Sequence, residues 1–230
     1  KKSNVVFFQN TDDLQLFKKA YLVDDSKTRL IPGSGVDTRR FCKVPLPDKK
    51  VVLFIGRLLY DKGIVELLHA SEIIQHNYPG QLEIRILGKF EIEAKLGVSE
   101  ELIELYHKRG IIRYLGTTDK VENEIEKASV VVLPSYREGT SRSLLEAAAM
   151  GRPLLASDVP GCNNIVRHNV NGWLFRPKSI EGLVIALEKL IAVSSTELEE
   201  KGQKSRDIVE QEFGESLVFN SYLEEINQII

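Results

Sequence analysis

The chain has 230 residues, of which 43% are hydrophobic and 28% are charged, so it can bury one sizeable core. Its 31 Lys and Arg side chains oppose 33 Asp and Glu side chains, and this balance provides no basic field for a nucleic-acid partner. No apolar run reaches the roughly 18 residues that span a bilayer, and the Lys-Lys start leads into Val-Val-Phe-Phe rather than a signal-peptide core. We expect a cytoplasmic globular protein.

The first fifty residues do not fit a repeated strand–helix–strand rhythm. The polar turn around Asp12 and Asp13 is expected to cap a helix rather than to bind a metal. Residues 29–37 predict a short strand and a glycine-rich turn, and a proline-bearing joint follows at 43–48. We therefore expect a boundary here, with a connection over 1–46, a main domain over 47–213 and a final helix over 214–230.

Short apolar runs then alternate with helical patterns. Strands are predicted at 51–56, 82–87, 111–115, 130–134 and 153–157, and helices at 64–75, 99–108, 180–191 and 215–230, with a charged stretch at 197–212. Most of these strands are apolar almost throughout, as in parallel sheets that are covered on both faces. The predicted fold class is α/β, a Rossmann-like parallel sheet with helices on both faces.

A first candidate binding loop follows the strand at 51–56. Gly56 lets backbone approach a ligand, while Arg57 and Lys62 supply two cations within one loop, before a helix that starts near Ile64. Open α/β sheets bind ligands at the carboxyl ends of their strands, so the loop suits a diphosphate. By itself, a solvated surface turn is the commoner explanation.

A second candidate segment follows the strand at 130–134. Glu138 precedes a polar turn, Gly139-Thr140-Ser141-Arg142-Ser143, whose amides lie at the start of a helix and would favour an anion. Glu146 is about one turn inside that helix, where a carboxylate can accept the paired hydroxyls of a ribose. The alternative is that Glu146 only interacts with the helix dipole and that Glu138 is a surface carboxylate.

The cysteines and histidines give no metal-ligand spacing. Cys42 and Cys162 are expected to be small core residues, in keeping with a reducing compartment. The four histidines are dispersed, and only His168, in a loop before Gly172, remains of interest. We expect no metal and no cofactor, because the cationic loop already supplies the charge that a divalent ion would bring.

The ordered motifs resemble a known family. The spacing Glu138-x7-Glu146 resembles the EX7E signature of retaining family 4 glycosyltransferases of the GT-B fold, and residues 56–63 resemble their donor-phosphate loop. Residues 31–37, 111–116 and 170–175 also match the family in order and approximate spacing. Several ordered matches are more specific than any one of them.

The resemblance implies a role for each matched residue. Arg57 and Lys62 would bind the donor diphosphate and stabilise the departing nucleotide, with Gly56 allowing close approach. Glu146 would hold the ribose, and Glu138 would contact the transferred sugar. The amides of Thr140, Ser141, Arg142 and Ser143 would complete the sugar and phosphate contacts beside Gly139. Backbone groups around Gly88, Arg113 and Leu115 would meet the base.

One departure concerns the sugar pocket. Many members of the family have a glycine and an apolar residue where this chain has Ser141 and Arg142. The backbone amides survive that change, while the shape and charge of the pocket do not. Arg142 could contact a phosphate or an acidic sugar, or it could point into solvent.

The resemblance also implies partners that are not in this sequence. The donor would be a nucleoside-diphosphate sugar, with a UDP-sugar expected from the family alone, and the acceptor a glycan or a lipid-linked molecule. Members have two Rossmann-like halves. This chain resembles the C-terminal, donor-binding half, so we expect an N-terminal GT-B domain as its partner and no transfer by the fragment alone. Peripheral association of the full-length protein with the inner face of the membrane would fit such an acceptor.

Two other functions are compatible with the same residues. A nucleotide-sugar epimerase of the same fold would isomerise its donor without an acceptor, and a non-catalytic module would only bind the nucleotide sugar. A dinucleotide oxidoreductase is disfavoured, because residues 56–63 lack the GxGxxG pattern.

Overall fold

The computed structural model describes residues 3–91 and 95–229. Six strands form one fully parallel sheet in the order β5-β4-β3-β6-β7-β8. Their bounds are β3 (Val51–Ile55), β4 (Glu83–Leu87), β5 (Arg113–Tyr114), β6 (Val130–Leu133), β7 (Leu154–Ser157) and β8 (Gly172–Phe175). The predicted α/β class and the five predicted strands of this sheet are confirmed, and β8 is added at one edge.

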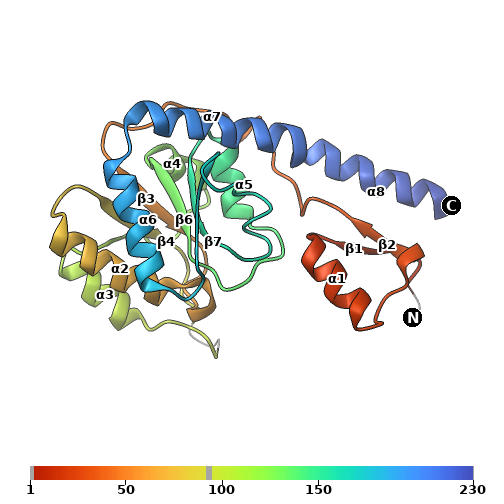
Figure 1. Cartoon of the computed structure of the whole chain (residues 1–230), viewed down its shortest axis with the longest axis horizontal. Helices are drawn as coiled ribbons and strands as arrows, with labels where there is room; N and C mark the ends of the chain where they lie inside the picture. Colours follow the sequence, from red (N-terminus) through yellow and green to blue (C-terminus); the bar gives the residue numbers. More distant parts are fainter. Residues whose placement is uncertain (1–2, 92–94, 230) are drawn as a thin grey trace.

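Helices cover both faces of this sheet (Figure 1). They are α2 (Ile64–Asn77), α3 (Glu100–Lys108), α4 (Val121–Glu126), α5 (Arg142–Ala149), α6 (Ile180–Ala192) and α7 (Ser195–Glu212). On one side α2 packs against α6, and on the other side α5 packs against α7. The six-residue α4 was not predicted, because its single buried side chain, Ile125, produces no apolar stripe in the sequence.

Local sequence explains where the elements form. Val51 to Phe54 in β3 and Val130 to Leu133 in β6 are all buried, as continuous apolar strands must be when helices cover both faces. Serine side chains cap several helices by accepting a bond from a first-turn amide, as Ser179 does for α6 and Ser194 for α7.

The strand order reverses direction between β3 and β6. The chain adds β4 and β5 on one side of β3 and then returns to place β6 on the other side, with Phe54 beside Val132. This reversal is a topological switch point, where the loops that leave neighbouring strands diverge and form a crevice at their carboxyl ends. Both candidate binding segments follow these two strands.

Residues 6–30 form a small unit of their own. Strand β1 (Val6–Phe8), helix α1 (Thr11–Lys19), the 3-10 turn η1 (Asp25–Lys27) and strand β2 (Thr28–Leu30) form a βαβ unit with two parallel strands. We call it the N-terminal unit. The expectation that this region departs from a strand–helix–strand arrangement is therefore wrong, because strands of three residues are too short to give a periodic signal.

The six-stranded sheet and its helices, from β3 to α7, form what we call the body. Helix α8 (Glu215–Ile229) connects the body with the N-terminal unit (Figure 1). Tyr222 on α8 packs on Phe7, with ring centroids 4.6 Å apart, and Glu225 forms an ion pair with Arg29. The helix at Asp12 and Asp13 is capped by Asn10 instead, while the two aspartates lie in its first turn. That expectation of the sequence is corrected.

Two arginines from the body hold the joint between these regions. Arg152 is fully buried, and its guanidinium donates to the carbonyls of Val44, at 3.1 Å, and Pro45, at 2.9 Å. Arg206 donates to the carbonyls of Thr38 and Phe41. Carbonyls of residues 38–45 therefore accept hydrogen bonds from these two side chains, and the Val44 amide donates to the Met150 carbonyl, in place of pairing in a sheet.

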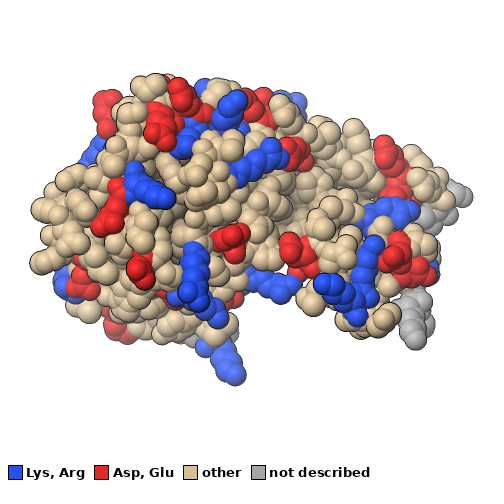
Figure 2. All heavy atoms as spheres, viewed as in Figure 1, with Lys and Arg blue, Asp and Glu red and all other residues tan. Residues whose placement is uncertain are grey.

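The surface charges are mixed, and the two cysteines differ in burial. Figure 2 shows acidic and basic side chains interspersed over the viewed face, without a continuous basic field. Cys162 is buried as expected, whereas Cys42 is exposed and the core assignment is wrong for it. None of the described helices has the length and apolar character required to cross a bilayer.

Candidate functional site

The loops after β3 and β6 are joined to each other. The Asp61 carbonyl accepts hydrogen bonds from the Tyr136 amide, at 2.8 Å, and from the Ser135 hydroxyl, at 3.2 Å. Gly63, with φ of 69°, ends the 3-10 turn η2 (Tyr60–Lys62), and a Cβ atom built on it would lie 2.0 Å from the Pro134 carbonyl oxygen. Glycine is therefore required for the close contact between the loops.

A hollow of about 370 Å³ lies where these loops meet, at the carboxyl ends of β3 and β6. Its lining brings together the residues predicted to bind the donor, with the exception of Gly139. They are Gly56, Arg57, Lys62, Glu138, Thr140, Ser141, Arg142, Ser143 and Glu146, and the apolar Ile55 and Leu133 complete the lining. Residues separated by some eighty positions thus share one cavity, because the parallel topology places their strand ends side by side.

Two of the charged residues in the hollow form an ion pair. The Lys62 ammonium lies 2.6 Å from the Glu138 carboxylate, and both side chains are largely buried, with 17% and 14% exposed. Water therefore screens this pair less than it screens a surface pair. Arg57 borders the same hollow and is exposed. Both predicted cations thus lie where an anion could reach them.

The start of α5 faces the hollow, but not all of its amides are free. Ser141 caps the helix, and its hydroxyl accepts from the Leu144 amide. The Ser141 amide itself donates to the Gly161 carbonyl at 3.1 Å. The prediction that this amide contacts a ligand is corrected, because another backbone group already satisfies it. The amides of Thr140, Arg142 and Ser143 have no hydrogen-bond partner within the described parts of the chain.

Glu146 is a buried carboxylate held by Arg142. The Arg142 Nε atom donates to Glu146 Oε1 at 2.9 Å, across one helical turn, while 73% of the arginine side chain stays exposed. Burial raises the pKa of Glu146 above its ordinary value, and the adjacent guanidinium opposes that rise. The departure at Arg142 therefore has a structural role: it pairs with Glu146 rather than pointing freely into solvent.

A second hollow of about 350 Å³ adjoins the first. It shares Arg142 and Glu146 with the first hollow and is otherwise lined by residues 34–37, Arg40, Phe41 and Glu215. The glycine-rich turn predicted from the sequence lies here. Gly35 has φ of 69° and faces the backbone of Glu215, so a side chain at that position would collide with the start of α8.

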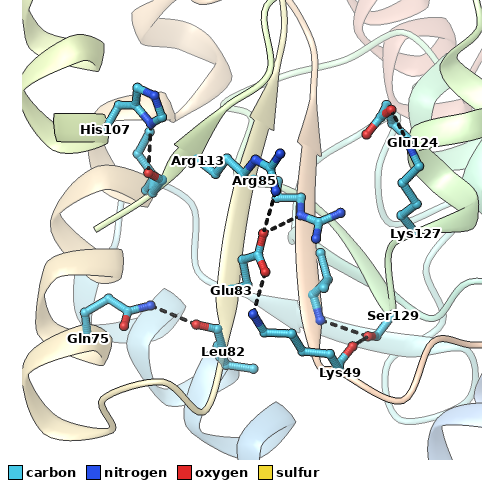
Figure 3. Close-up of polar contacts among 12 residues, drawn as sticks. Lys49, Gln75, Leu82, Glu83, Arg85, His107, Arg113, Glu124, Lys127 and Ser129 are labelled. Atoms are coloured by element: carbon cyan, nitrogen blue, oxygen red, sulfur yellow. Dashed lines mark hydrogen bonds and ion pairs between the residues drawn. The ribbon is translucent and has the colours of Figure 1, made fainter. Parts of the chain in front are cut away.

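The three residues suggested for the base lie in different places. Gly88 follows β4 against Gly56, since a Cβ atom on it would be 1.9 Å from the Gly56 carbonyl oxygen. Leu115 pairs through its amide with Ile86, at the same end of the sheet. The Arg113 side chain points elsewhere, with its guanidinium 3.8 Å from Glu83 at the amino end of β4 (Figure 3). None of the three residues lines the first hollow, and a contact of their backbone groups with the base stays a prediction.

The structure adds residues that no motif indicated. Tyr136 donates to the Glu66 carboxylate, and the Lys178 ammonium lies 4.7 Å from the centre of its ring. Arg40 bonds to Glu122 at 3.0 Å and contributes positive charge near Glu146. These contacts join segments far apart in the chain, so no local spacing could have indicated them.

His168 has a structural contact rather than a place in the hollow. Its Nδ1 atom accepts a bond from the Leu174 amide at 3.0 Å. Within residues 3–91 and 95–229, no cluster of three or more His, Cys, Asp or Glu side chains could hold a metal ion. A donor site without metal remains a prediction.

Solved structures of glycosyltransferases with the GT-B fold share this architecture. The chain superposes on sucrose-phosphate synthase from Thermosynechococcus elongatus with a TM-score of 0.84 and 24% identity, covering 99% of this chain and 59% of that one. For the Anabaena protein HepE in complex with UDP-glucose, the TM-score is 0.83 at 18% identity, over 98% of this chain and 64% of the other. These likenesses define the fold.

The family follows from the sequence. The model for glycosyl transferases group 1 matches residues 37–206, and the chain belongs to this family. It is 27% identical over 194 residues to an Escherichia coli UDP-Gal:alpha-D-GlcNAc-diphosphoundecaprenol alpha-1,3-galactosyltransferase, covering 79% of this chain and 49% of the relative. It is 26% identical over 188 residues to the capsular polysaccharide biosynthesis glycosyltransferase CapM of Staphylococcus aureus, covering 78% and 48%. The chain thus spans about half the length of these curated relatives.

Proposed function

We propose that the first hollow binds a nucleoside-diphosphate sugar, with a UDP-sugar as the preferred donor, for retaining transfer to a glycan or lipid-linked acceptor. The observation that carries this proposal is the convergence of Arg57, Lys62, the α5 amides and the buried Glu146 in one cavity at the switch point of the sheet. Cations and helix amides suit the diphosphate, and a carboxylate suits the ribose hydroxyls.

The Lys62–Glu138 ion pair gives this proposal a mechanism. An incoming diphosphate would attract Lys62 away from Glu138 and free the carboxylate for the hydroxyls of the sugar. Lys62 and Arg57 would then offset the negative charge that grows on the departing nucleotide in the transition state. Because this exchange of partners would accompany donor binding, both cations would already face the diphosphate when the sugar is transferred.

The acceptor is proposed from the relatives. One relative is named for action on GlcNAc-diphosphoundecaprenol, and another for biosynthesis of a capsular polysaccharide. A glycan or lipid-linked acceptor is consistent with both names. Acceptor contacts would come from a second domain facing the hollow, and we expect this chain without such a domain to bind the donor but not to transfer the sugar.

Calorimetry with UDP, GDP, ADP and uridine tests the donor site. We expect UDP to bind, and we expect Arg57→Ala or Lys62→Ala to weaken UDP by about 10-fold to 100-fold, because each removes charge-assisted hydrogen bonds worth roughly 1.5–3 kcal/mol. Uridine binding should hardly change. Lys49→Ala, which removes an exposed lysine beside Glu83, is the matched control.

The opposite results would contradict the assignment. Absence of binding to every diphosphate by the folded chain would exclude a donor site, and equal losses for UDP and uridine would exclude the phosphate roles of Arg57 and Lys62. A protein with the complete domain set that isomerises a UDP-sugar without acceptor would be an epimerase. One that stays fully active after Glu138→Ala and Lys62→Ala would not use this hollow for transfer.

A further inference from the structure

The loop that carries Glu138 is contacted from the N-terminal unit as well as from the body. We propose that Asn10, at the start of α1, is a positioning residue that holds this loop, so that the sugar-binding part of the site depends on the placement of the N-terminal unit. The effect on sugar binding rests on the proposed donor site, whereas the contact of Asn10 with the loop does not depend on any ligand.

Asn10 uses all of its side-chain polar atoms and is only 4% exposed. Its Nδ2 atom donates to the Gly139 carbonyl at 2.8 Å and to the Asp13 carboxylate at 2.9 Å. Its Oδ1 atom accepts from the Asp13 amide at 2.8 Å and thereby caps α1. One buried amide group therefore joins the end of a helix to the residue that follows Glu138.

Two further contacts join residues 9–13, around the start of α1, to the loop that carries Glu138. The Thr140 hydroxyl donates to the Gln9 carbonyl at 3.0 Å, and Arg137 forms an ion pair with Asp13. Together with the bond from Asn10, these contacts fall on both sides of Glu138 in the sequence. The bond made by Asn10 is the most shielded of the three, because Arg137 is largely exposed.

The body holds the loop from the opposite side. The Glu138 amide donates to the Pro160 carbonyl at 3.2 Å, and a Cβ atom on Gly161 would lie 2.4 Å from the Glu138 carbonyl oxygen. The carboxylate that faces Lys62 thus belongs to a segment fixed between two regions. A displacement of the N-terminal unit would change the position of Glu138, whereas Arg57 and Glu146 have no contact with residues 9–13 among the described hydrogen bonds and ion pairs.

Two substitutions at position 10 separate helix capping from loop positioning. Asn10→Asp and Asn10→Ser both retain an oxygen that can cap α1, but the aspartate cannot donate to Gly139 and the serine is too short to reach it. Thr140→Val removes the hydroxyl that donates to the Gln9 carbonyl, and it does so without a change in α1. Asp24→Asn, at the cap of η1, is the matched control in the N-terminal unit.

Hydrogen–deuterium exchange with peptide resolution is the first measurement. We expect the amides of residues 137–141 to exchange at least threefold faster in both Asn10 variants and in Thr140→Val, with α1 retained and the Asp24→Asn control unchanged. Wild-type exchange in all three variants would overturn the proposal. If Asn10→Asp also exposes α1, the Thr140→Val result decides, because that residue lies outside the helix.

Calorimetry is the second measurement, with UDP, UDP-glucose and UDP-galactose as probes. The Asn10 variants should bind UDP within about twofold of the wild-type affinity. If the wild-type chain binds a UDP-sugar more tightly than UDP, that difference in affinity should disappear in the variants. An equal loss for UDP would contradict selective positioning of Glu138. Absence of UDP binding in the wild-type chain would refute the proposed function instead, while the exchange result would still test the contact.

Discussion

The six-stranded body and the N-terminal unit use similar elements but differ in how completely they bury them. In the body, β3 and β6 are apolar and fully covered, and their side chains belong to one continuous core. In the N-terminal unit, α1 has no buried residue, and Leu16, Tyr21 and Leu22 are exposed, Tyr21 by 95%. Parallel strands are normally buried on both faces, so two strands with one helix do not form an independent core.

This difference indicates where stability and where interaction reside. The body has the core of a complete domain, whereas the N-terminal unit depends on α8 and on the contacts of Asn10 and Thr140 with the loop of the site. Its exposed apolar side chains are typical of a surface that another protein surface covers. Substitutions in each region can test this contrast.

Core substitutions should affect the two regions very differently. Phe54→Ala in β3 should lower the free energy of unfolding by about 3–5 kcal/mol, because it leaves a cavity in a fully buried site. Phe17→Ala in α1 should cost less, about 1–2 kcal/mol, since Phe17 packs against Phe8 but is 39% exposed. Urea denaturation followed by circular dichroism measures both. Similar losses would show that the N-terminal unit shares the cooperative core.

Loss of the buried Arg152 guanidinium at the joint should have a smaller effect on the free energy of unfolding than loss of Phe54. Arg152→Leu removes the donors to the Val44 and Pro45 carbonyls and should destabilise the chain by about 1–3 kcal/mol, partly offset because no charge has to be buried. Limited proteolysis should then cleave more readily within residues 38–48. Arg39→Leu, at an exposed arginine, is the control. If Arg152→Leu leaves the rate of cleavage within residues 38–48 unchanged, Arg152 does not hold the joint.

Acid should weaken the body through Glu83. Arg85 and Lys49, each 2.7 Å from this carboxylate, lower its pKa from 4.5 to about 2 (Figure 3). A lowered folded-state pKa stabilises the protein above pH 4.5, and that contribution is lost as the pH falls from 4.5 towards 2. Glu83→Gln should therefore be less stable than wild type at pH 7, and the difference should shrink over that interval. A difference that is constant from pH 7 to pH 2 would be inconsistent with this ion pair.

The smallest effect on stability is expected at the surface of the N-terminal unit. Tyr21→Ser and Leu22→Ser should change the free energy of unfolding by no more than about 0.5 kcal/mol, because both side chains are exposed. A large loss of stability would mean that these side chains belong to a core, and the contrast between the two regions would fail.

Much of the body could be predicted from local sequence. Continuous apolar runs specified β3, β6 and β7, since a strand covered on both faces admits few polar residues, while β4 alternates charged and apolar residues at its start. The spacing from Glu138 to Glu146 located the candidate site, because a strand end followed by a polar turn and a helix start can be recognised within twenty residues. The N-terminal unit was missed, as its three-residue strands carry too little pattern.

Tertiary structure decided how those residues are used. The sequence by itself determined the parallel α/β class and the cationic and acidic residues of the two loops. Only the fold paired Lys62 with Glu138, satisfied the Ser141 amide with the Gly161 carbonyl, turned the Arg113 side chain towards Glu83 and placed Asn10 against Gly139. The physical reason is that local patterns record burial and periodicity, whereas a hydrogen bond between distant segments depends on the strand order that brings them together.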